Sequence, residues 1–306
     1  MTSTKVLTLY LCKDKRYFRE KNFLSVKNQE GVDQRVFIIS AKPIKVDAPN
    51  IVVPTKSDWL LPIRVSFSIN IALKIIELKY NVKLRDFDYI FKVDSDALLP
   101  NNYVKKLVSQ PILVAGIGPA LIISVPFFIK ALSKKYPVTY CDDGFVTAKS
   151  IALGLWPRSL RSDSLIVPPV KFDSKKEFAY GIEYYKWGLS PLLLALVLMF
   201  SRVLRLRPHE KRSLRAHVAN IAGYIWASLH GIEKYSFWQD YRRMRNRHFA
   251  ESVLRALSYL KKLMFFAFFP GTFGFFGFSG YEHFYCFLQG HRLFALWRCN
   301  VVDLYA

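Results

Sequence analysis

The stretch that most constrains the fold is a hydrophobic run that ends directly in two aspartates, Tyr89-Ile-Phe-Lys-Val-Asp-Ser-Asp-Ala97. A short apolar run of this kind predicts a buried strand. Ligands of open α/β sheets bind outside the carboxyl ends of strands, so Asp94 and Asp96 are candidate ligands of a hard cation such as Mg²⁺ or Mn²⁺. The competing interpretation is an ordinary turn, because Asp and Ser are common turn residues.

The first 185 residues alternate short apolar runs with helical patterns. Strands are predicted at residues 6–12, 36–40, 51–53 and 89–93, and helices at 14–29 and 66–78. This order is typical of an α/β sheet with parallel strands and crossover helices.

Residues 107–129 carry no charge and are long enough to be mistaken for a membrane span. Gly116, Gly118, Pro119 and Pro126 argue against one continuous helix. We therefore expect a strand, a glycine-containing turn, a second strand and the start of a helix in this segment.

A second acidic motif, Tyr140-Cys-Asp-Asp-Gly-Phe-Val146, precedes a helical pattern that runs to Leu155. One of its two carboxylates, Asp142, could simply cap the helix. A carboxylate at the mouth of a site can also deprotonate an attacking hydroxyl. We predict that Asp143 is this general base.

Taken in order, these segments resemble the family 2 glycosyltransferases, which have a GT-A fold. The similar segments are KVLTLYLCKDKRYFREKNFLSVKNQ, Leu61–Val65 followed by Asn70, FKVDSDALLPNNYV and CDDGFVTAKSIALGLWP, over residues 5–157. The resemblance implies a Rossmann-like mixed sheet flanked by helices, and inverting transfer from a UDP- or GDP-sugar with Mg²⁺ or Mn²⁺. It implies that Asp94 and Asp96 bind the metal and the nucleotide, that Asp143 is the base, that Asp142 supports it, and that Arg64 lies near the nucleotide or diphosphate.

Two departures from the family pattern limit what the resemblance predicts. No acid follows the second strand, where Ser40-Ala-Lys-Pro43 stands instead, so the identity of the nucleotide stays open. The Gln-x-x-Arg-Trp motif of processive members is replaced by Tyr185-Lys-Trp-Gly188. We therefore expect transfer of one sugar per acceptor.

Residues 186–306 form a second predicted region, which is helical, basic and aromatic. The chain has 45 basic and 23 acidic side chains and a net charge of +22, so a negatively charged partner is expected. Residues 187–201 are apolar but too short to span a bilayer, and arginines follow at once. Residues 213–231 predict another apolar helix, residues 241–248 are a dense basic run, and residues 263–281 predict an interfacial hairpin or a packed lid.

These features predict a peripheral or monotopic protein on an anionic membrane surface. The amino-terminal apolar run is too short for a signal peptide, so we expect the catalytic part at the cytoplasmic face of the membrane. A membrane location favours a polyprenyl phosphate or a lipid-linked glycan as the acceptor.

Three other functions are compatible with parts of the sequence. A transferase of the same fold could modify a polysaccharide or a protein glycan. A nucleic-acid-binding protein would explain the charge but not the aspartate pairs, and no nucleic-acid-binding motif is present, so no nucleic acid partner is expected. A nucleotidyltransferase could use the acid pair, but it normally has a glycine-rich phosphate loop near the amino terminus, and none is visible.

Overall fold

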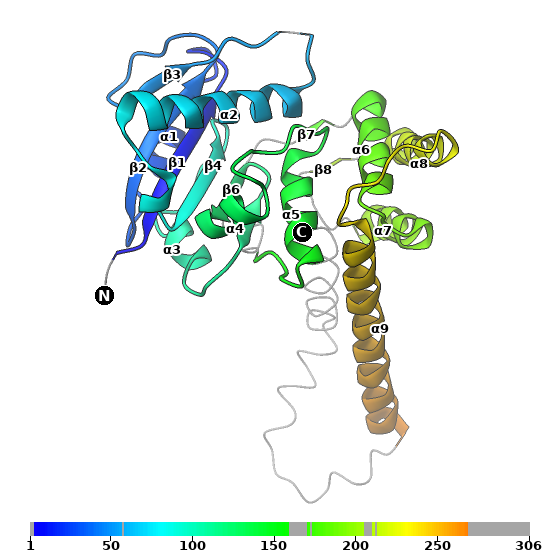
Figure 1. The fold of residues 1–306 in the computed structure, drawn as a ribbon. Coiled ribbons are helices and arrows are strands. Elements are labelled where there is room, and N and C mark those ends of the chain that lie inside the picture. Colours follow the sequence, from blue (N-terminus) through cyan, green and yellow to red (C-terminus); the bar gives the residue numbers. More distant parts are fainter. Residues whose placement is uncertain are drawn as a thin grey trace, which may run out of the picture.

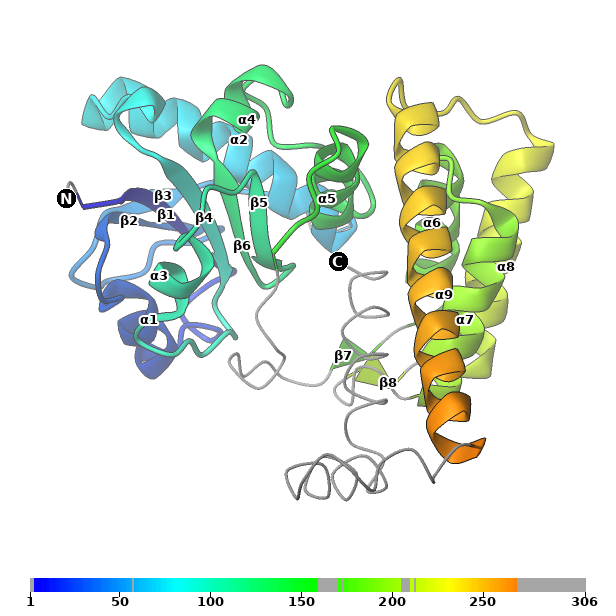
Figure 2. The same cartoon turned by 90° about the horizontal axis from the view of Figure 1, so that it is seen from below.

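The computed structural model describes residues 3–56, 58–158, 170–171, 173–204, 210–211 and 213–268. Its amino-terminal part is a sheet covered by helices, and its carboxyl-terminal part is a group of helices beside it (Figures 1 and 2). The proposed division at residue 185 stays a prediction, although helix α6 (Ser174–Lys186) packs mainly against α8 (Leu214–Leu229).

Six strands form the sheet in the order β3-β2-β1-β4-β6-β5. Their bounds are β1 Lys5–Cys12, β2 Asp33–Ser40, β3 Asn50–Val52, β4 Tyr89–Asp94, β5 Val114–Ile117 and β6 Ala120–Ser124. The first four are mutually parallel, as expected, whereas β6 runs antiparallel to both β4 and β5. The two-residue link Gly118-Pro119 is too short for a crossover, so β5 and β6 pair as a hairpin. The predicted mixed sheet flanked by helices is confirmed.

Helices cover both faces of the sheet (Figure 2). On one face lie α2 (Leu61–Tyr80), α4 (Val125–Lys130) and α5 (Asp142–Ala152), and on the other lie α1 (Glu20–Lys27) and α3 (Tyr103–Leu107). A short 3-10 helix, Leu84–Asp86, leads into β4. Alternate side chains of the buried strands therefore enter two separate hydrophobic cores.

The helix predicted at residues 14–29 is shorter than expected and begins at Glu20. The carboxylate of Asp14 accepts hydrogen bonds from the backbone N–H and the guanidinium of Arg16, which stabilises a turn in place of the first helical turns. In contrast, the strand, glycine turn, strand and helix predicted within residues 107–129 are confirmed as β5, β6 and α4.

The carboxyl-terminal part contains α6, α7 (Pro191–Leu204), α8 and α9 (Trp238–Phe268), with the short strands β7 (Val170–Lys171) and β8 (Glu210–Lys211) pairing in parallel. Helices α7 and α8 match the two predicted apolar helices. Residues 263–268, which were expected to belong to a hairpin or lid, continue α9, and residues 269–281 lie outside the described residues. Within the described ranges, no helix is long and apolar enough to cross a membrane.

A third hydrophobic cluster joins the two parts of the molecule. Phe145 of α5 packs edge-on against Tyr235 and Phe237, with ring centroids 4.8 and 5.2 Å apart. Trp156, which follows α5, faces His248 and the guanidinium of Arg245 from α9. Helix α5 therefore contacts both the sheet and the helical part.

Candidate active site

The two acidic motifs meet at the carboxyl end of β4. Lys92 and Asp94 point to the same face of the strand, which is the face that α5 covers. The Lys92 ammonium is 3.3 Å from Oδ1 of Asp94 and donates a 2.7 Å hydrogen bond to the carbonyl oxygen of Gly118, in the turn between β5 and β6. The carboxyl end of β4, the turn of the β5–β6 hairpin and the start of α5 together border the site.

Helix α5 begins at Asp142 and carries both predicted acids in its first turn, where the helix dipole favours negative charge. The residue before the helix, Cys141, occupies the N-cap position without a capping bond from its side chain. Asp142 is therefore not the N-cap, and the capping interpretation of this residue is wrong. Its carboxylate is buried beside Tyr136.

The two acids of α5 have different surroundings. Asp142 is only 6% exposed, whereas Asp143 is half-buried. Oδ1 of Asp143 accepts a 2.8 Å hydrogen bond from the backbone N–H of Gly144. Its Oδ2 lies so close to Gly118 that a Cβ atom at this glycine would collide with it. The backbone amide of Gly144 thus fixes one oxygen of the more accessible carboxylate, and the missing side chain at Gly118 leaves room for the other.

Burial and mutual charge shift the ionisation of this cluster. Burial raises the pKa of Asp142 to about 7, against the opposing charge of Lys92. It also raises the pKa of Asp94, again opposed by Lys92. Burial alone would lower the pKa of Lys92, but Asp94, Asp142 and Asp143 outweigh this effect and raise it. Lys92 therefore stays protonated inside the protein.

The prediction from the sequence missed Lys92. It did carry a signal, because a lysine within an otherwise apolar buried strand requires a partner, and an aspartate stands two residues later on the same face. Its contact with the β5–β6 turn could not be read from local sequence.

The loop before α5 also contributes to the site. The side chain of Asn70 on α2 makes two 2.8 Å hydrogen bonds with the backbone of Tyr136. Tyr136 is buried near Asp142, and burial together with the charge of Asp142 raises the pKa of the tyrosine. From the other side, Tyr180 of α6 is close enough to Cys141 and Asp143 for their charges to add to the rise in its pKa that burial causes. The site is therefore lined by both parts of the molecule.

Asp94 and Asp96 are compatible with a divalent cation. Asp96 is exposed just beyond β4 and close enough to Asp94 for its charge to raise the pKa of that carboxyl. Among the described residues, no group of three or more His, Cys, Asp or Glu side chains could hold a metal. A cation here would complete its shell with water or substrate phosphates, which is common for Mg²⁺.

Arg64 is the most separate of the predicted site residues. It lies in the first turn of α2, half-buried, and its Nε is buried with no hydrogen-bond partner among the described residues. Its predicted place near the nucleotide stays a prediction.

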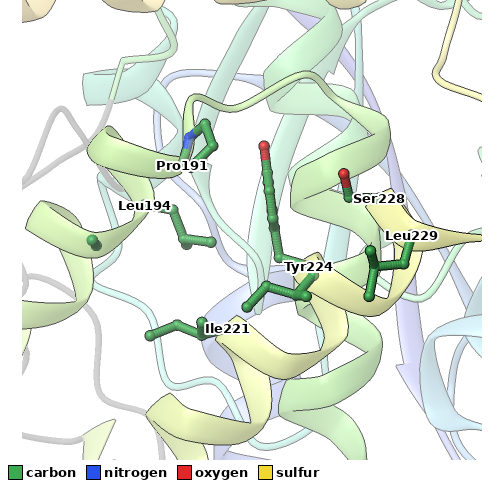
Figure 3. A pocket seen from close by; sticks show the side chains of 8 residues that line it. Pro191, Leu194, Ile221, Tyr224, Ser228 and Leu229 are labelled. Carbon is green, nitrogen blue, oxygen red and sulfur yellow. The ribbon is translucent and has the colours of Figure 1, made fainter. Parts of the chain in front are cut away.

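A pocket of about 310 Å³ lies between α7 and α8 (Figure 3). Its walls are almost entirely apolar and include Pro191, Leu194, Ile221 and Leu229, with Tyr224 between them. The hydroxyl of Tyr224 donates to the carbonyl oxygen of Leu189, so it is already satisfied. With no charged side chain in its lining, this pocket is unsuited to a nucleotide or a phosphate.

Sequence comparisons find no matching family model and no matching curated protein. Among solved structures, the chain is similar to the mannosyltransferase PcManGT from Pyrobaculum calidifontis in complex with GDP-Man and Mn²⁺. The two share 11% identity at a TM-score of 0.42, over 99% of this chain and 86% of the other.

It is also similar to residues 1–349 of S. aureus TarS, with 11% identity and a TM-score of 0.40 over 76% of this chain and 93% of that one. For the glycosyltransferase GlyE of Streptococcus pneumoniae TIGR4 the identity is 12% and the TM-score 0.31, over 52% and 46% of the two chains. Two of the three are named as transferases of sugars. Since all three TM-scores are below 0.5, the functional argument rests on the site itself.

Proposed function

We propose that this chain is an inverting, nucleotide-sugar-dependent glycosyltransferase of the GT-A type. The observation that carries the proposal is the meeting of two motifs that are 49 positions apart, Asp94 and Asp143, around Gly118. One carboxylate is accessible for proton transfer, and a separate acid pair is suited to a cation.

In the proposed reaction, the acceptor hydroxyl oxygen attacks the anomeric carbon of the donor sugar, and Asp143 takes the hydroxyl proton. The bond between the anomeric carbon and the phosphate oxygen breaks, and the nucleoside diphosphate leaves with its electron pair. A divalent cation bound by Asp94 and Asp96 would offset the charge of that leaving group. The hydrogen bond from Gly144 keeps one oxygen of Asp143 fixed while the base acts.

The test measures release of nucleoside diphosphate from UDP-, GDP- and dTDP-sugars with Mn²⁺ or Mg²⁺, with and without polyprenyl phosphate. Asp143→Asn should lower the rate by roughly a thousandfold, the scale of a lost general base. Asp86→Asn is the matched control, since Asp86 is exposed near the opposite end of β4. Equal rates in Asp143→Asn and wild type would contradict the assignment of the base.

The acceptor is proposed to be a polyprenyl phosphate or a lipid-linked glycan, and the protein to sit on the cytoplasmic face of the membrane. The support is an exposed apolar stripe along α8, formed by Leu214, Val218, Ile221, Ile225 and Leu229. Leu192 of α7, which follows Pro191 of the pocket wall in the chain, is also exposed. A helix face of this kind suits insertion into the interface of a bilayer.

The net charge favours a bilayer over a second copy of the chain as the partner of this surface. At +22, two copies repel one another, whereas an anionic lipid surface attracts the protein. Cosedimentation with vesicles that contain anionic lipid should therefore be strong for the wild type and at least about tenfold weaker for Leu229→Glu. Leu78→Glu is the matched control, because Leu78 is 85% exposed on α2 and Leu229 is 80% exposed.

Equal vesicle binding by Leu229→Glu and Leu78→Glu would contradict this membrane surface. A loss of self-association in Leu229→Glu without a loss of vesicle binding would favour the second copy instead. Stimulation by soluble glycans alone would favour the polysaccharide or protein-glycan acceptor.

A further inference from the structure

The end of helix α6 carries a motif, Tyr185-Lys-Trp-Gly188, that the proposed reaction does not use. Trp187 stands directly after the helix, and its backbone N–H donates a 2.9 Å hydrogen bond to the carbonyl oxygen of Glu183. Gly188 follows in the left-handed conformation, at φ 79°, and a Cβ atom there would meet Trp238 at 2.8 Å. This helix end therefore fixes the direction in which the side chain of Trp187 leaves the backbone.

The indole ring of Trp187 reaches the first turn of α5. The residue is 5% exposed. A Cβ atom at Gly144 would lie only 2.5 Å from Cη2 of Trp187, and equally close to Sγ of Cys141. The ring edge and the thiol thus fill the space that a side chain at residue 144 would need.

The same turn of α5 holds the proposed base. The backbone N–H of Gly144 is at the start of the helix, where amides lack a helical acceptor, and it donates to Oδ1 of Asp143 at 2.8 Å. The thiol of Cys141 lies 3.6 Å from the same oxygen. A displacement of the Trp187 ring would therefore release the turn whose amide fixes the carboxylate.

Packing alone does not explain an indole at residue 187. Its neighbours Leu189, Leu193 and Leu194 in the third hydrophobic cluster are aliphatic. The N–H of the buried indole has no hydrogen-bond partner among the described residues, although a buried tryptophan usually finds one. Because an unsatisfied buried donor is destabilising, a phenylalanine or leucine would suit a purely structural position better.

We propose that Trp187 is a positioning residue for the base Asp143. Its ring edge holds the first turn of α5 in place at Gly144, and the amide of Gly144 in turn orients the carboxylate. The helical part of the molecule thereby orients an acid that belongs to α5. The inference rests on the proposed function in assigning the base to Asp143.

The first readout is hydrogen exchange at the Gly144 amide, which does not depend on activity. The protein is labelled with ¹⁵N in its 14 glycines, and the Gly144 signal is identified by its absence from Gly144→Ala. Trp187→Phe shortens the ring that reaches Gly144 and should speed exchange of this amide by about tenfold, the scale of one lost hydrogen bond. Asp143→Ala should do the same, because it removes the acceptor.

The matched control is Leu193→Ala, which opens the same cluster on α7, where the side chain is 4% exposed. We expect exchange at Gly144 to stay within about threefold of the wild type in this variant, since a loss of general stability does not single out one amide. Thermal melting of both variants verifies that the control is destabilised at least as much as Trp187→Phe.

The second readout is the rate of nucleoside diphosphate release in the transfer assay. Trp187→Phe should lower kcat by about a hundredfold, the scale of a catalytic group displaced by about 1 Å. The KM for the donor should stay within about threefold, because the base does not bind the donor, and Leu193→Ala should keep both constants near those of the wild type.

Exchange at Gly144 and a kcat that are the same in Trp187→Phe and Leu193→Ala would overturn the inference. If Trp187→Phe does not fold, Gly144→Ala tests the contact from its other side. The added methyl group must displace the ring or the turn, so it should lower kcat by about a hundredfold, and a wild-type kcat in Gly144→Ala would overturn the inference as well.

The failure of the proposed function looks different. Wild-type protein that releases no nucleoside diphosphate from any donor would contradict the transferase itself. The exchange rates at Gly144 would still decide whether Trp187 orders the turn that holds Asp143.

Discussion

The strands of the sheet bury most of their apolar side chains, whereas helices α7 to α9 leave many of theirs exposed. The strands bury them on both faces, and Leu7, Leu9, Phe37 and Phe91 are fully inaccessible. In the helical part, α7 buries Leu193, Leu194 and Leu198, but other leucine, isoleucine and valine side chains of α7, α8 and α9 are exposed. Both parts are rich in apolar residues, so the apolar content alone does not separate them.

This difference indicates two kinds of role. The sheet is complete in itself and holds Lys92, Asp94 and the start of α5 in fixed positions. Exposing the apolar side chains of α7 and α8 to water is unfavourable. Under the proposed function, a membrane surface would cover them. The site lies where the two parts meet, since Tyr180 of α6 reaches the acids of α5.

The largest expected effect compares two leucines of equal chemistry. Leu7→Ala in β1, where the side chain is 0% exposed, should lower the free energy of unfolding by about 2 to 5 kcal/mol. Leu229→Ala on α8 should change it by less than about 0.5 kcal/mol. Urea unfolding followed by circular dichroism measures both, and equal losses would remove the contrast between the two parts.

Gly118→Ala should separate activity from stability within the sheet. The added Cβ would meet only the end of the Asp143 side chain, so the backbone can stay in place while the carboxylate moves. A displacement of about 1 Å can cost about a hundredfold in rate. We expect this loss in the transfer assay with a melting temperature within about 2 °C of the wild type. An active Gly118→Ala would show that the position of Asp143 is not critical.

The junction between the two parts can be loosened through Arg245. Its guanidinium lies over Trp156 at 5.4 Å and over Tyr241 at 5.7 Å, and the residue is 5% exposed. Arg245→Met should lower the free energy of unfolding by about 2 kcal/mol. Arg243→Met, which removes only an exposed pair with Asp240, should have almost no effect. Similar urea midpoints for the two variants would mean that this contact does not join the parts.

The smallest expected effect concerns pH. The pKa of Asp142 is about 7 in the folded protein and near its ordinary value of 3.8 when unfolded. Between these values the folded state holds a proton that the unfolded state has lost, so the stability of the wild type falls as the pH rises through this window.

Asp142→Asn removes this dependence, although the new amide keeps polar atoms in a buried site. We expect the variant to gain roughly 1 kcal/mol relative to the wild type between pH 5 and pH 8, in the presence of a chelator. Melting temperatures at the two pH values measure the change. A wild type that becomes more stable than the variant as the pH rises would reverse the sign of the argument.

Local sequence determined much of the sheet part. Apolar runs of four to eight residues predicted β1, β2, β4 and the hairpin of β5 and β6, because a buried strand needs such a run whatever its neighbours are. The acids at the end of β4 and at the start of α5 were chosen as candidates from their position. The end of a strand and the start of a helix both lie at the border of the sheet, where a ligand can reach them. The start of α1 was not predicted, because the side chain of Asp14 competes with the helix.

Only the tertiary structure decided how these pieces meet. The direction of β6, the packing of α5 on both parts and the contact of Lys92 with Gly118 each join residues that are far apart in the chain. The sequence assigned the base to Asp143 and a capping or supporting role to Asp142, but only packing shows that Asp142 is buried and Asp143 half-buried. Local patterns fix which residues can be buried, whereas the charge balance of a site depends on which distant groups share the same low-dielectric interior.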